Sequence, residues 1–321
     1  MRLLVTGARG FVGSALVHHL VSRRPDWVVR AAARGWECPG PTVGFERMVI
    51  GDLARQPDWS DLVRDVDVVI HCAAKVHIRQ EHASGVAAAF RAVNVEGSVG
   101  LATAASAAGC RRFVFLSTAK LLAGGGAECL SDAQNEAEWR SDPYTASKRE
   151  GERALQACCA RSGMELVIVR PPLVYGPGAG GNFRSLMRAV ASGLPLPLGA
   201  IRNRRSFIAL ENLVDFLATV AIHPSAAGRT FEVCDGEDLS TEAFVRKLAS
   251  AMGRRTWIPS VPVALLRGLA AVIGRRSQMT SLSESLVLDM TEAVSLLGWT
   301  PPVRMDVALK NAVGAACKRS A

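Results

Sequence analysis

The sequence predicts an α/β protein built on a doubly wound parallel sheet, and three observations support this fold class. Short runs rich in β-branched residues alternate with longer alanine-rich stretches through the first half of the 321 residues. A glycine-rich turn, TGARGFVG, directly follows the first of these runs. Hydrophobic residues make up 49% of the chain, which is enough for a large buried core.

Six runs in the first half are expected to be strands of this sheet. They are LLVTG (3–7), WVVRAAA (27–33), RMVIG (47–51), VDVVIHCAA (66–74), RFVFLST (112–118) and ELVIVRPP (165–172). The stretches between them are expected to be helices, including a long one over 87–109 despite Gly97 and Gly100. Glycine and proline then crowd 171–199, so we predict a first domain, 1–175, and a smaller C-terminal α/β region, 176–321.

The C-terminal region is expected to contain mainly helices. Helices are predicted at 211–223 and 240–253, a strand at 229–235, and two final helices separated by a GWTPP turn. The apolar run VPVALLRGLAAVIG (261–274) contains Arg267 and is too short to span a bilayer. We interpret it as a buried or half-buried helix, with a helix that associates weakly with a membrane surface as the alternative.

Charge and cysteine content limit the kinds of ligand and partner that we expect for this chain. The formal net charge of +9 comes mainly from arginines spread along the chain, which suits an anionic small molecule at least as well as nucleic acid. No zinc-finger or RNA-binding motif is present, so we expect no nucleic-acid partner. The eight cysteines lack metal-ligand or disulfide spacing, and no secretory leader precedes the first strand, so we expect reduced thiols, no metal site and a cytoplasmic location.

The glycine turn predicts a dinucleotide site. Gly7, Gly10 and Gly13 lie between a strand and a helix, with a second strand about twenty residues further on. Backbone amides at a helix N-terminus bind pyrophosphate, and glycine lets the phosphates approach closely. The sheet is therefore expected to be of the Rossmann type.

The end of the second strand indicates which dinucleotide. An acid is expected there if the adenosine ribose is unphosphorylated, but VVRAAARGW contains none. It offers Arg30 and Arg34 instead, with Arg9 in the glycine turn nearby, so NADP(H) is favoured and NAD(H) is possible. Asp52 in GDL is a candidate to bind the adenine amino group.

The stretch DPYTASKRE predicts the acid of an enzyme. Pro143 can begin a helix, which places Tyr144 and Lys148 one turn apart on the same face. A nearby ammonium favours the phenolate and would lower the pKa of the tyrosine from about 10. Ser117 and Thr118 end the preceding strand, at the sheet edge where ligands of α/β proteins bind.

These motifs carry a family resemblance over nearly the whole chain. TGARGFVG, GDL, HCAA, FLSTA and YTASK, in this order and spacing, resemble the extended short-chain dehydrogenase/reductase family of nucleotide-sugar epimerases, dehydratases and reductases. RPPLVYGPG, RRSFIALENLVD and LLGWTPP resemble substrate-region motifs of that family.

The resemblance implies a role for each matching residue. Tyr144 and Lys148 would be the catalytic pair, and Thr118 the catalytic hydroxyl with Ser117 beside it. Substrate would contact Thr118, Tyr144, Asn94, Asn182 and Arg205. The cofactor would contact Gly7, Arg9, Gly10, Phe11, Val12, Gly13, Arg34, Asp52, Leu53, Ala73, Ala74, Lys148 and Pro171. A homodimer would form on the helices around 87–109 and 143–161.

The reaction follows from a departure from the family pattern. Dehydratases carry an Asp-Glu pair after the hydroxyl, where this chain has Ala119 and Lys120. Dehydration is therefore disfavoured. The arginines at the end of the second strand favour a reductase, and the resemblance implies NADPH-dependent reduction of a UDP-4-keto-6-deoxy-N-acetylhexosamine, as in bacterial surface-polysaccharide synthesis. A UDP-hexose 4-epimerase that retains NAD is the alternative.

Two further alternatives are less favoured. A non-catalytic NADP-binding sensor would typically have lost Tyr144 or Lys148, and a steroid-type dehydrogenase would not need Asn182 and Arg205 for a diphosphate. The sugar stereochemistry, the nucleoside and the oligomeric state stay open.

Overall fold

The computed structural model describes residues 1–36, 44–76, 83–122, 142–272 and 276–318. In these residues a parallel seven-stranded sheet has the order β3-β2-β1-β4-β5-β6-β9, and β7 and β8 form a second, two-stranded parallel sheet. The strands are β1 (Arg2–Thr6), β2 (Val28–Ala33), β3 (Phe45–Val49), β4 (Val68–His71), β5 (Arg112–Leu116), β6 (Glu165–Arg170), β7 (Leu173–Tyr175), β8 (Phe207–Ala209) and β9 (Thr230–Glu232).

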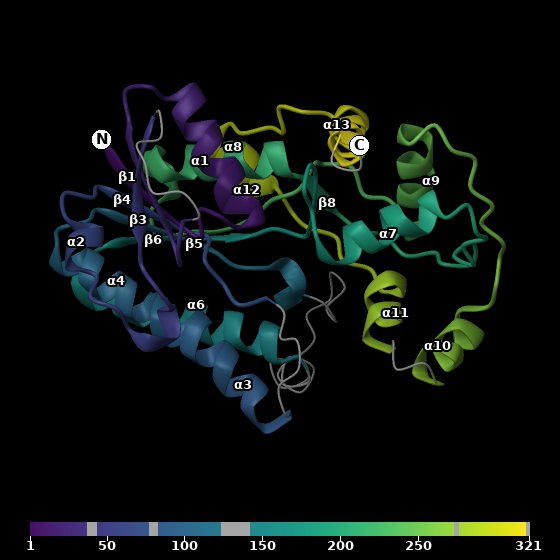
Figure 1. Cartoon of the computed structure of the whole chain (residues 1–321), viewed down its shortest axis with the longest axis horizontal. Helices are drawn as coiled ribbons and strands as arrows, with labels where there is room; N and C mark the ends of the chain where they lie inside the picture. The colour runs from purple at the N-terminus through teal and green to yellow at the C-terminus, as the bar shows by residue number, and fades with distance from the viewer. Residues whose placement is uncertain (37–43, 77–82, 123–141, 273–275, 319–321) are drawn as a thin grey trace.

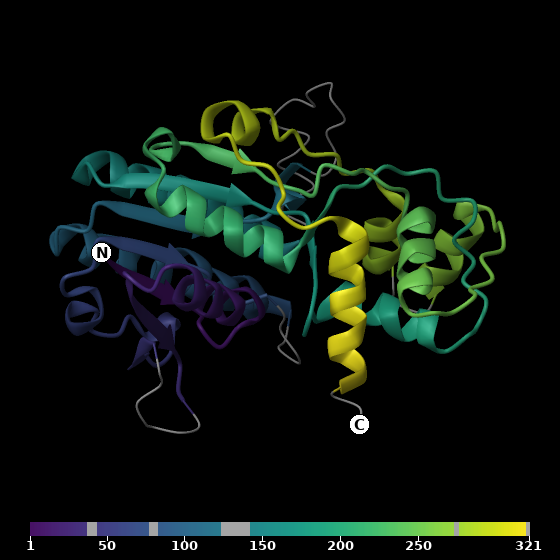
Figure 2. The same ribbon diagram turned by 90° about the horizontal axis from the view of Figure 1, so that it is seen from above.

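Helices cover both faces of the large sheet, as predicted (Figures 1 and 2). α1 and α8 pack together on one face, and α4 and α6 pack together on the other. The helices are α1 (Phe11–Arg23), α2 (Ser60–Val63), α3 (Ala83–Arg91), α4 (Ser98–Ala107), α6 (Pro143–Ser162), α7 (Gly181–Ala191), α8 (Leu210–Ile222), α9 (Thr241–Ala251), α10 (Val263–Val272), α11 (Arg276–Ser283), α12 (Thr291–Leu297) and α13 (Met305–Lys318).

The strands form because their residues are apolar on both faces. Along β1, Leu3 and Val5 enter the core beneath α1 and α8, whereas Leu4 enters the core beneath α4 and α6. Side chains alternate along a strand, so a continuous apolar run fits a sheet covered on both sides. The doubly wound α/β fold class is confirmed.

The chain returns to the large sheet after it has left for the C-terminal region. β9 pairs with β6, and α8 lies against α1, although both follow residue 176. Trp299, further along, packs edge-to-face on Phe216 of α8 with 4.8 Å between ring centroids. The predicted boundary at 176 thus marks where the chain first leaves the sheet, while 210–232 and Trp299 contribute to the first domain's core.

The C-terminal region has a core of its own around a cluster of aromatic rings. Phe207 stacks on Phe244 at 4.0 Å between centroids, and Tyr175 and Phe183 contact the same Phe244. α7, α9 and α13 supply much of this core. The predicted helices at 211–223, 240–253 and the chain's end are all present, and Ser240 caps α9 by accepting from the amide of Ala243.

The expectation of a buried or half-buried helix at 261–274 was wrong for the part that the structure describes. In α10, Leu266 packs on the C-terminal core, but Leu265, Leu269 and Val272 are exposed. No neighbouring element among the described residues covers that side of the helix. In the described part of the chain, no helix has the length and apolar character to cross a bilayer.

Candidate active site

The carboxyl ends of β1, β4, β5 and β6 lie at one edge of the parallel sheet, and the predicted site residues follow them there. Gly7, after β1, has a φ of +68°, and a Cβ on it would lie 2.8 Å from the amide nitrogen of Ala73, after β4. A Cβ on Gly13 would lie 2.2 Å from the carbonyl oxygen of Gly7. Glycine is therefore needed at both positions for the turn, β4 and α1 to pack this closely.

The N-terminus of α1 fits a pyrophosphate. Gly10 is the N-cap and supplies no side-chain hydrogen bond, and the first turn contains no acid. Its first amides are thus not capped by a side chain and can donate to a bound anion. Phe11 and Val12 begin the helix half-buried against the core, which fixes the direction of this helix end.

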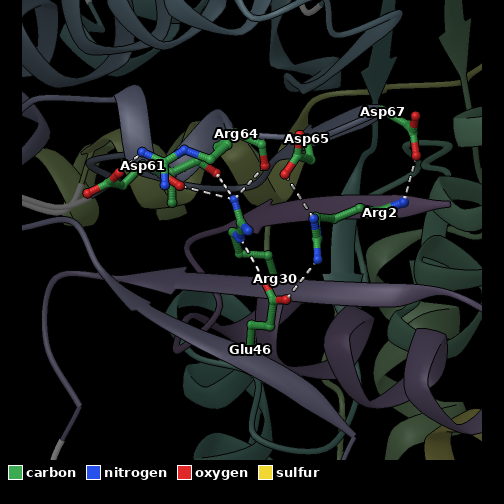
Figure 3. Close-up of polar contacts among 8 residues, drawn as sticks. Arg2, Arg30, Glu46, Asp61, Arg64, Asp65 and Asp67 are labelled. Atoms are coloured by element: carbon green, nitrogen blue, oxygen red, sulfur yellow. Dashed lines mark hydrogen bonds and ion pairs between the residues drawn. The ribbon is translucent and has the colours of Figure 1, made fainter.

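Arg30 is not available to a cofactor phosphate, so the interpretation that offered it was wrong (Figure 3). Its Nε donates to Glu46 over 2.8 Å, and its Nη1 donates to the carbonyl oxygens of Asp61, Leu62 and Arg64. Arg30 lies three residues before the end of β2, roughly 10 Å from the sheet edge at the usual rise of a strand. It instead holds the end of α2 on the sheet.

Arg34 and Arg9 lie beside the end of β2, where the sequence predicts the ribose end of a dinucleotide. Arg34 directly follows β2 and is exposed, and Arg9 donates through Nη1 to the carbonyl oxygen of Gly35 over 2.9 Å. The two guanidinium groups therefore come from adjacent segments at one edge of the sheet. The charge there suits a phosphate monoester.

Asp52 and Leu53 follow β3 at the same edge. The Asp52 carboxylate is exposed and accepts from the amide of Ala54, so it caps a single 3₁₀ turn (Leu53–Arg55). Leu53 is buried, and a Cβ on Gly97 would touch it. Leu53 thus packs under the neighbouring helix, and its contact with a cofactor stays a prediction.

Tyr144 lies in the first turn of α6. Asp142 is the N-cap and accepts from the Tyr144 amide over 3.2 Å, and Pro143 occupies the first helical position as predicted. Phe90 packs edge-to-face on the tyrosine ring, and Lys120 Nζ lies 5.7 Å from its centroid.

The pKa of Tyr144 is shifted in the direction opposite to our prediction. Burial, and then the charge of Asp142, raise the pKa of Tyr144 to about 12, although a hydrogen bond with Thr118 opposes this. The expected lowering by Lys148 is missing because the lysine amine lies against other groups. Tyr144 is therefore protonated at neutral pH and can act as an acid.

Lys148 is 2% exposed and lies beneath the tyrosine turn. Its Nζ donates to the Leu116 carbonyl oxygen over 2.7 Å and lies 4.3 Å from the centroid of the Phe115 ring. Burial lowers the pKa of Lys148 to about 8, and the nearby Cys72 and Glu152 oppose that shift. The lysine joins α6 to the end of β5.

Ser117 and Thr118, the two residues that follow β5, have different partners. Ser117 donates to Glu152 over 2.5 Å, and Arg170 pairs with the same buried carboxylate. Thr118 is the hydroxyl that bonds Tyr144. The structure therefore favours Thr118 over Ser117 as the reacting hydroxyl.

Asn94 is 1% exposed and lies in a π-helical segment (Ala92–Gly97) between α3 and α4. Its amide exchanges two hydrogen bonds with the Lys75 backbone, and it donates to Ser147 Oγ over 2.9 Å. A π-helical segment of this kind often re-aims one side chain at a functional site. Here it lets Asn94 join the loop after β4 to α6. The contact of Asn94 with a substrate stays a prediction.

Two predicted substrate contacts lie in the C-terminal region. Asn182 is exposed in the first turn of α7, whose N-terminus has no side-chain cap. Arg205 precedes β8, is largely buried, and donates to the Glu284 carbonyl oxygen over 2.8 Å. Burial lowers the pKa of Arg205.

Sequence reasoning missed two buried polar residues beneath the site. Glu152 continues the four-residue spacing of Tyr144 and Lys148, and that stripe was the signal that could have revealed it. His71 lies between Thr6 and Ser98, at 2.7 and 3.0 Å, and burial lowers its pKa to about 3. Neutral His71 therefore fastens β1, β4 and α4 together. His71 begins the HCAA motif, but the motif alone gave the histidine no role.

Metal chemistry finds no support in the geometry. In the ranges that the structure describes, no three His, Cys, Asp or Glu side chains gather as a metal site would require.

The order of the parallel sheet and the glycine turn after β1 describe a Rossmann-type domain. A sequence profile described as the NAD dependent epimerase/dehydratase family matches residues 3–234. The chain belongs to this family, which confirms the resemblance seen in the sequence.

Relatives and solved structures agree with this membership. The chain is 36% identical to a UDP-glucose 4-epimerase of Vibrio cholerae over 96% of its own length and 93% of that protein. A structure described as MoeE5 in complex with UDP-glucose and NAD covers both chains fully at 25% identity, with a TM-score of 0.73. A Bacillus cereus UDP-glucuronic acid 4-epimerase shares the fold at 19% identity, covers 99% of both chains and has a TM-score of 0.75.

Proposed function

We propose that the chain uses NADPH to reduce the 4-keto group of a UDP-4-keto-6-deoxy-N-acetylhexosamine. The observation that carries this proposal is the placement of Arg9 beside Gly35, next to Arg34 at the end of β2, where the segment 28–36 contains no acid. Guanidinium groups there favour a 2′-phosphate, and NADPH is the usual donor of biosynthetic reductions.

The site residues supply the acid half of the reaction. The coenzyme would supply a hydride to C4 of the sugar. Tyr144, protonated at neutral pH, would give its proton to O4, and Thr118 would hydrogen-bond the same oxygen. Lys148, whose amine donates to the Leu116 carbonyl oxygen beneath the tyrosine turn, would bind the ribose of the nicotinamide.

Dehydration is not favoured by this site. Ala119 is buried and offers no acid or base, and Lys120 forms an ion pair with Asp142 over 3.6 Å. Elimination of water needs an acid and a base beyond the tyrosine. The described residues at these positions supply neither a carboxylate nor a second hydroxyl.

The second candidate is a UDP-hexose 4-epimerase that retains NAD. The 36% identity to the Vibrio cholerae enzyme of that name favours it, and so does the NAD in the MoeE5 complex. An epimerase oxidises and reduces the same carbon and so consumes no coenzyme.

One assay separates the two candidates. Purified protein would be mixed with NADPH and the UDP-4-keto sugar, nicotinamide absorbance followed, and the heat-denatured supernatant searched for released coenzyme. Stoichiometric loss of NADPH without carried-over nucleotide supports the reductase. Tightly held NAD and no consumption would establish the epimerase.

A variant then tests the arginines. Arg34→Ser should raise the KM for NADPH by about tenfold and leave that for NADH unchanged, since a charged hydrogen bond contributes about 1.5–3 kcal/mol. Arg23→Ser, an exposed arginine at the other end of α1, is the matched control. Equal effects of Arg34→Ser on both coenzymes would remove the basis for preferring NADPH.

A further inference from the structure

The stripe of apolar side chains on α10 faces solvent. Leu265, Leu269 and Val272 are 65%, 59% and 84% exposed, and their spacing places them on one side of the helix. Leu266, on another side, holds the helix to the C-terminal core. A helix of a globular protein usually buries its apolar side chains against the core. In α10 these three apolar side chains face solvent instead.

The surface continues onto neighbouring segments. Trp257 is 70% exposed and Leu194 is 66% exposed, and the Leu196 amide donates to the Trp257 carbonyl oxygen over 2.9 Å, which holds the two segments together. Figure 1 shows α10 and the segment that leads to it at the end of the molecule away from the large sheet. We call this surface, formed by 254–272 with Leu194, the α10 surface.

The α10 surface is also strongly basic. From 243 to 283 the sequence contains no Asp or Glu, while Arg254, Arg255, Arg267, Arg275 and Arg276 all lie between 254 and 276. Arg254, Arg255 and Arg267 are exposed, and the hydrogen bonds of Arg254 and Arg267 go to the neutral Ala191 carbonyl and Ser283 hydroxyl. In the described residues, Arg254, Arg255 and Arg267 therefore belong to the same segment as the exposed leucines, and that segment contains no acid.

We propose that the α10 surface docks on an anionic lipid bilayer. Leucine and valine side chains would enter the boundary of the hydrocarbon, Trp257 would lie at the headgroup level, and the arginines would pair with lipid phosphates. The helix would lie on the membrane, since α10 is too short to cross it. This inference rests on the exposure and charge of α10, and so it holds whichever sugar reaction the enzyme catalyses.

Charge argues against the other occupants of this surface. A second copy in a two-fold dimer would bring the same patch face to face, arginine against arginine without an acid between them. Nucleic acid would satisfy the arginines but would leave the leucine stripe in water. A bilayer with anionic lipids satisfies both kinds of side chain.

The test is flotation of the full chain with vesicles. The probes are phosphatidylcholine vesicles with and without phosphatidylglycerol, at low and high salt. The protein should float with the anionic vesicles, and binding should weaken as salt rises. Leu265→Ser with Leu269→Ser should weaken binding by about tenfold or more. Arg255→Gln with Arg267→Gln should weaken it by about tenfold at low salt.

Matched controls change exposed residues elsewhere. Val49→Ser and Arg161→Gln lie on the first domain and should bind vesicles as the unchanged chain does. Turnover without vesicles should be equal in all variants, which shows that they fold.

Three outcomes would overturn the proposal. The first is that the unchanged chain fails to float with anionic vesicles. The second is that the leucine variant binds them as tightly as before, which would assign binding to charge alone. The third is that the leucine variant shifts the oligomeric state in analytical ultracentrifugation, which would assign the α10 surface to a second copy.

Discussion

The two tyrosines of this chain occupy opposite kinds of surroundings. Tyr175, in the C-terminal region, is fully buried and donates to Asp235 over 2.6 Å. Asp235 also accepts from the Ala209 amide and the Asn212 side chain, so the phenol proton has a fixed acceptor. Tyr144, at the sheet edge, has Thr118 as its hydroxyl partner and the Lys120 ammonium near its ring.

Burial raises the pKa of both phenols, yet the consequences differ. At Tyr175 the proton completes a buried hydrogen-bond network and stabilises the fold. At Tyr144 the neighbours are a hydroxyl and an amine that can both stabilise a phenolate. A tyrosine can act as an acid where neighbouring groups stabilise its phenolate, and burial alone does not provide such groups.

The largest expected effect is at Tyr144. Tyr144→Phe removes the proton donor and should lower turnover by about 10²–10⁴-fold while nucleotide binding is retained. The free energy of unfolding should change by less than about 1 kcal/mol, since the hydroxyl has few partners. Steady-state kinetics and coenzyme titration measure these two effects. Near-normal turnover would contradict the assignment of Tyr144 as the proton donor.

Tyr175→Phe should show the reverse pattern. The change leaves Asp235 without one donor in a buried network, which should cost about 1–3 kcal/mol of unfolding free energy. Turnover per folded molecule should stay close to that of the unchanged chain. Urea unfolding followed by circular dichroism measures the first quantity, and a stable but inactive variant would contradict the comparison.

Lys120→Met should have a smaller effect. The change removes the cation near the Tyr144 ring and leaves the Asp142 carboxylate unpaired, so the phenolate becomes less stable. Turnover should fall by about tenfold or less. Lys120→Arg, which keeps the charge, is the matched control and should retain most of the activity; equal losses in the two variants would exclude a role for charge.

The smallest expected effect is a titration of Lys148 in the unchanged chain. The Lys148 amine should titrate near pH 8 in the protein without nucleotide, because burial disfavours its charge. Its folded pKa lies below the unfolded value of 10.5, so this group makes the fold more stable as pH rises from about 8 to 10.5. NMR of isotope-labelled lysine measures the titration, and a value near 10.5 would contradict the burial argument.

The sequence predicted the strands and the sheet-edge residues well because both depend on local pattern. Apolar runs specified the strands to within a few residues, and the order of motifs located Gly7, Thr118 and Tyr144 at one edge. Contacts distant in sequence were not predictable in this way. The pattern at β2 did not reveal that Arg30 meets the end of α2, nor that β9 pairs with β6.

Side-chain orientation accounts for the remaining differences between the sequence predictions and the structure. Ser117 and Thr118 are adjacent and chemically alike, and the path of the backbone after β5 decides which partner each hydroxyl meets. The pKa of Tyr144 depends on where the Lys148 amine points, which helical spacing does not determine. The exposure of α10 depends on what packs beside it, and composition alone favoured burial.

The return of β9 to the sheet has a consequence for synthesis of the chain. The edge of β6 stays unpaired until residues 230–232 leave the ribosome, and α8 must arrive before α1 is fully covered. An unpaired strand edge invites pairing with other chains, so a fragment ending at residue 175 should aggregate rather than fold. We therefore expect the first domain to complete its folding only when α8 and β9 are present.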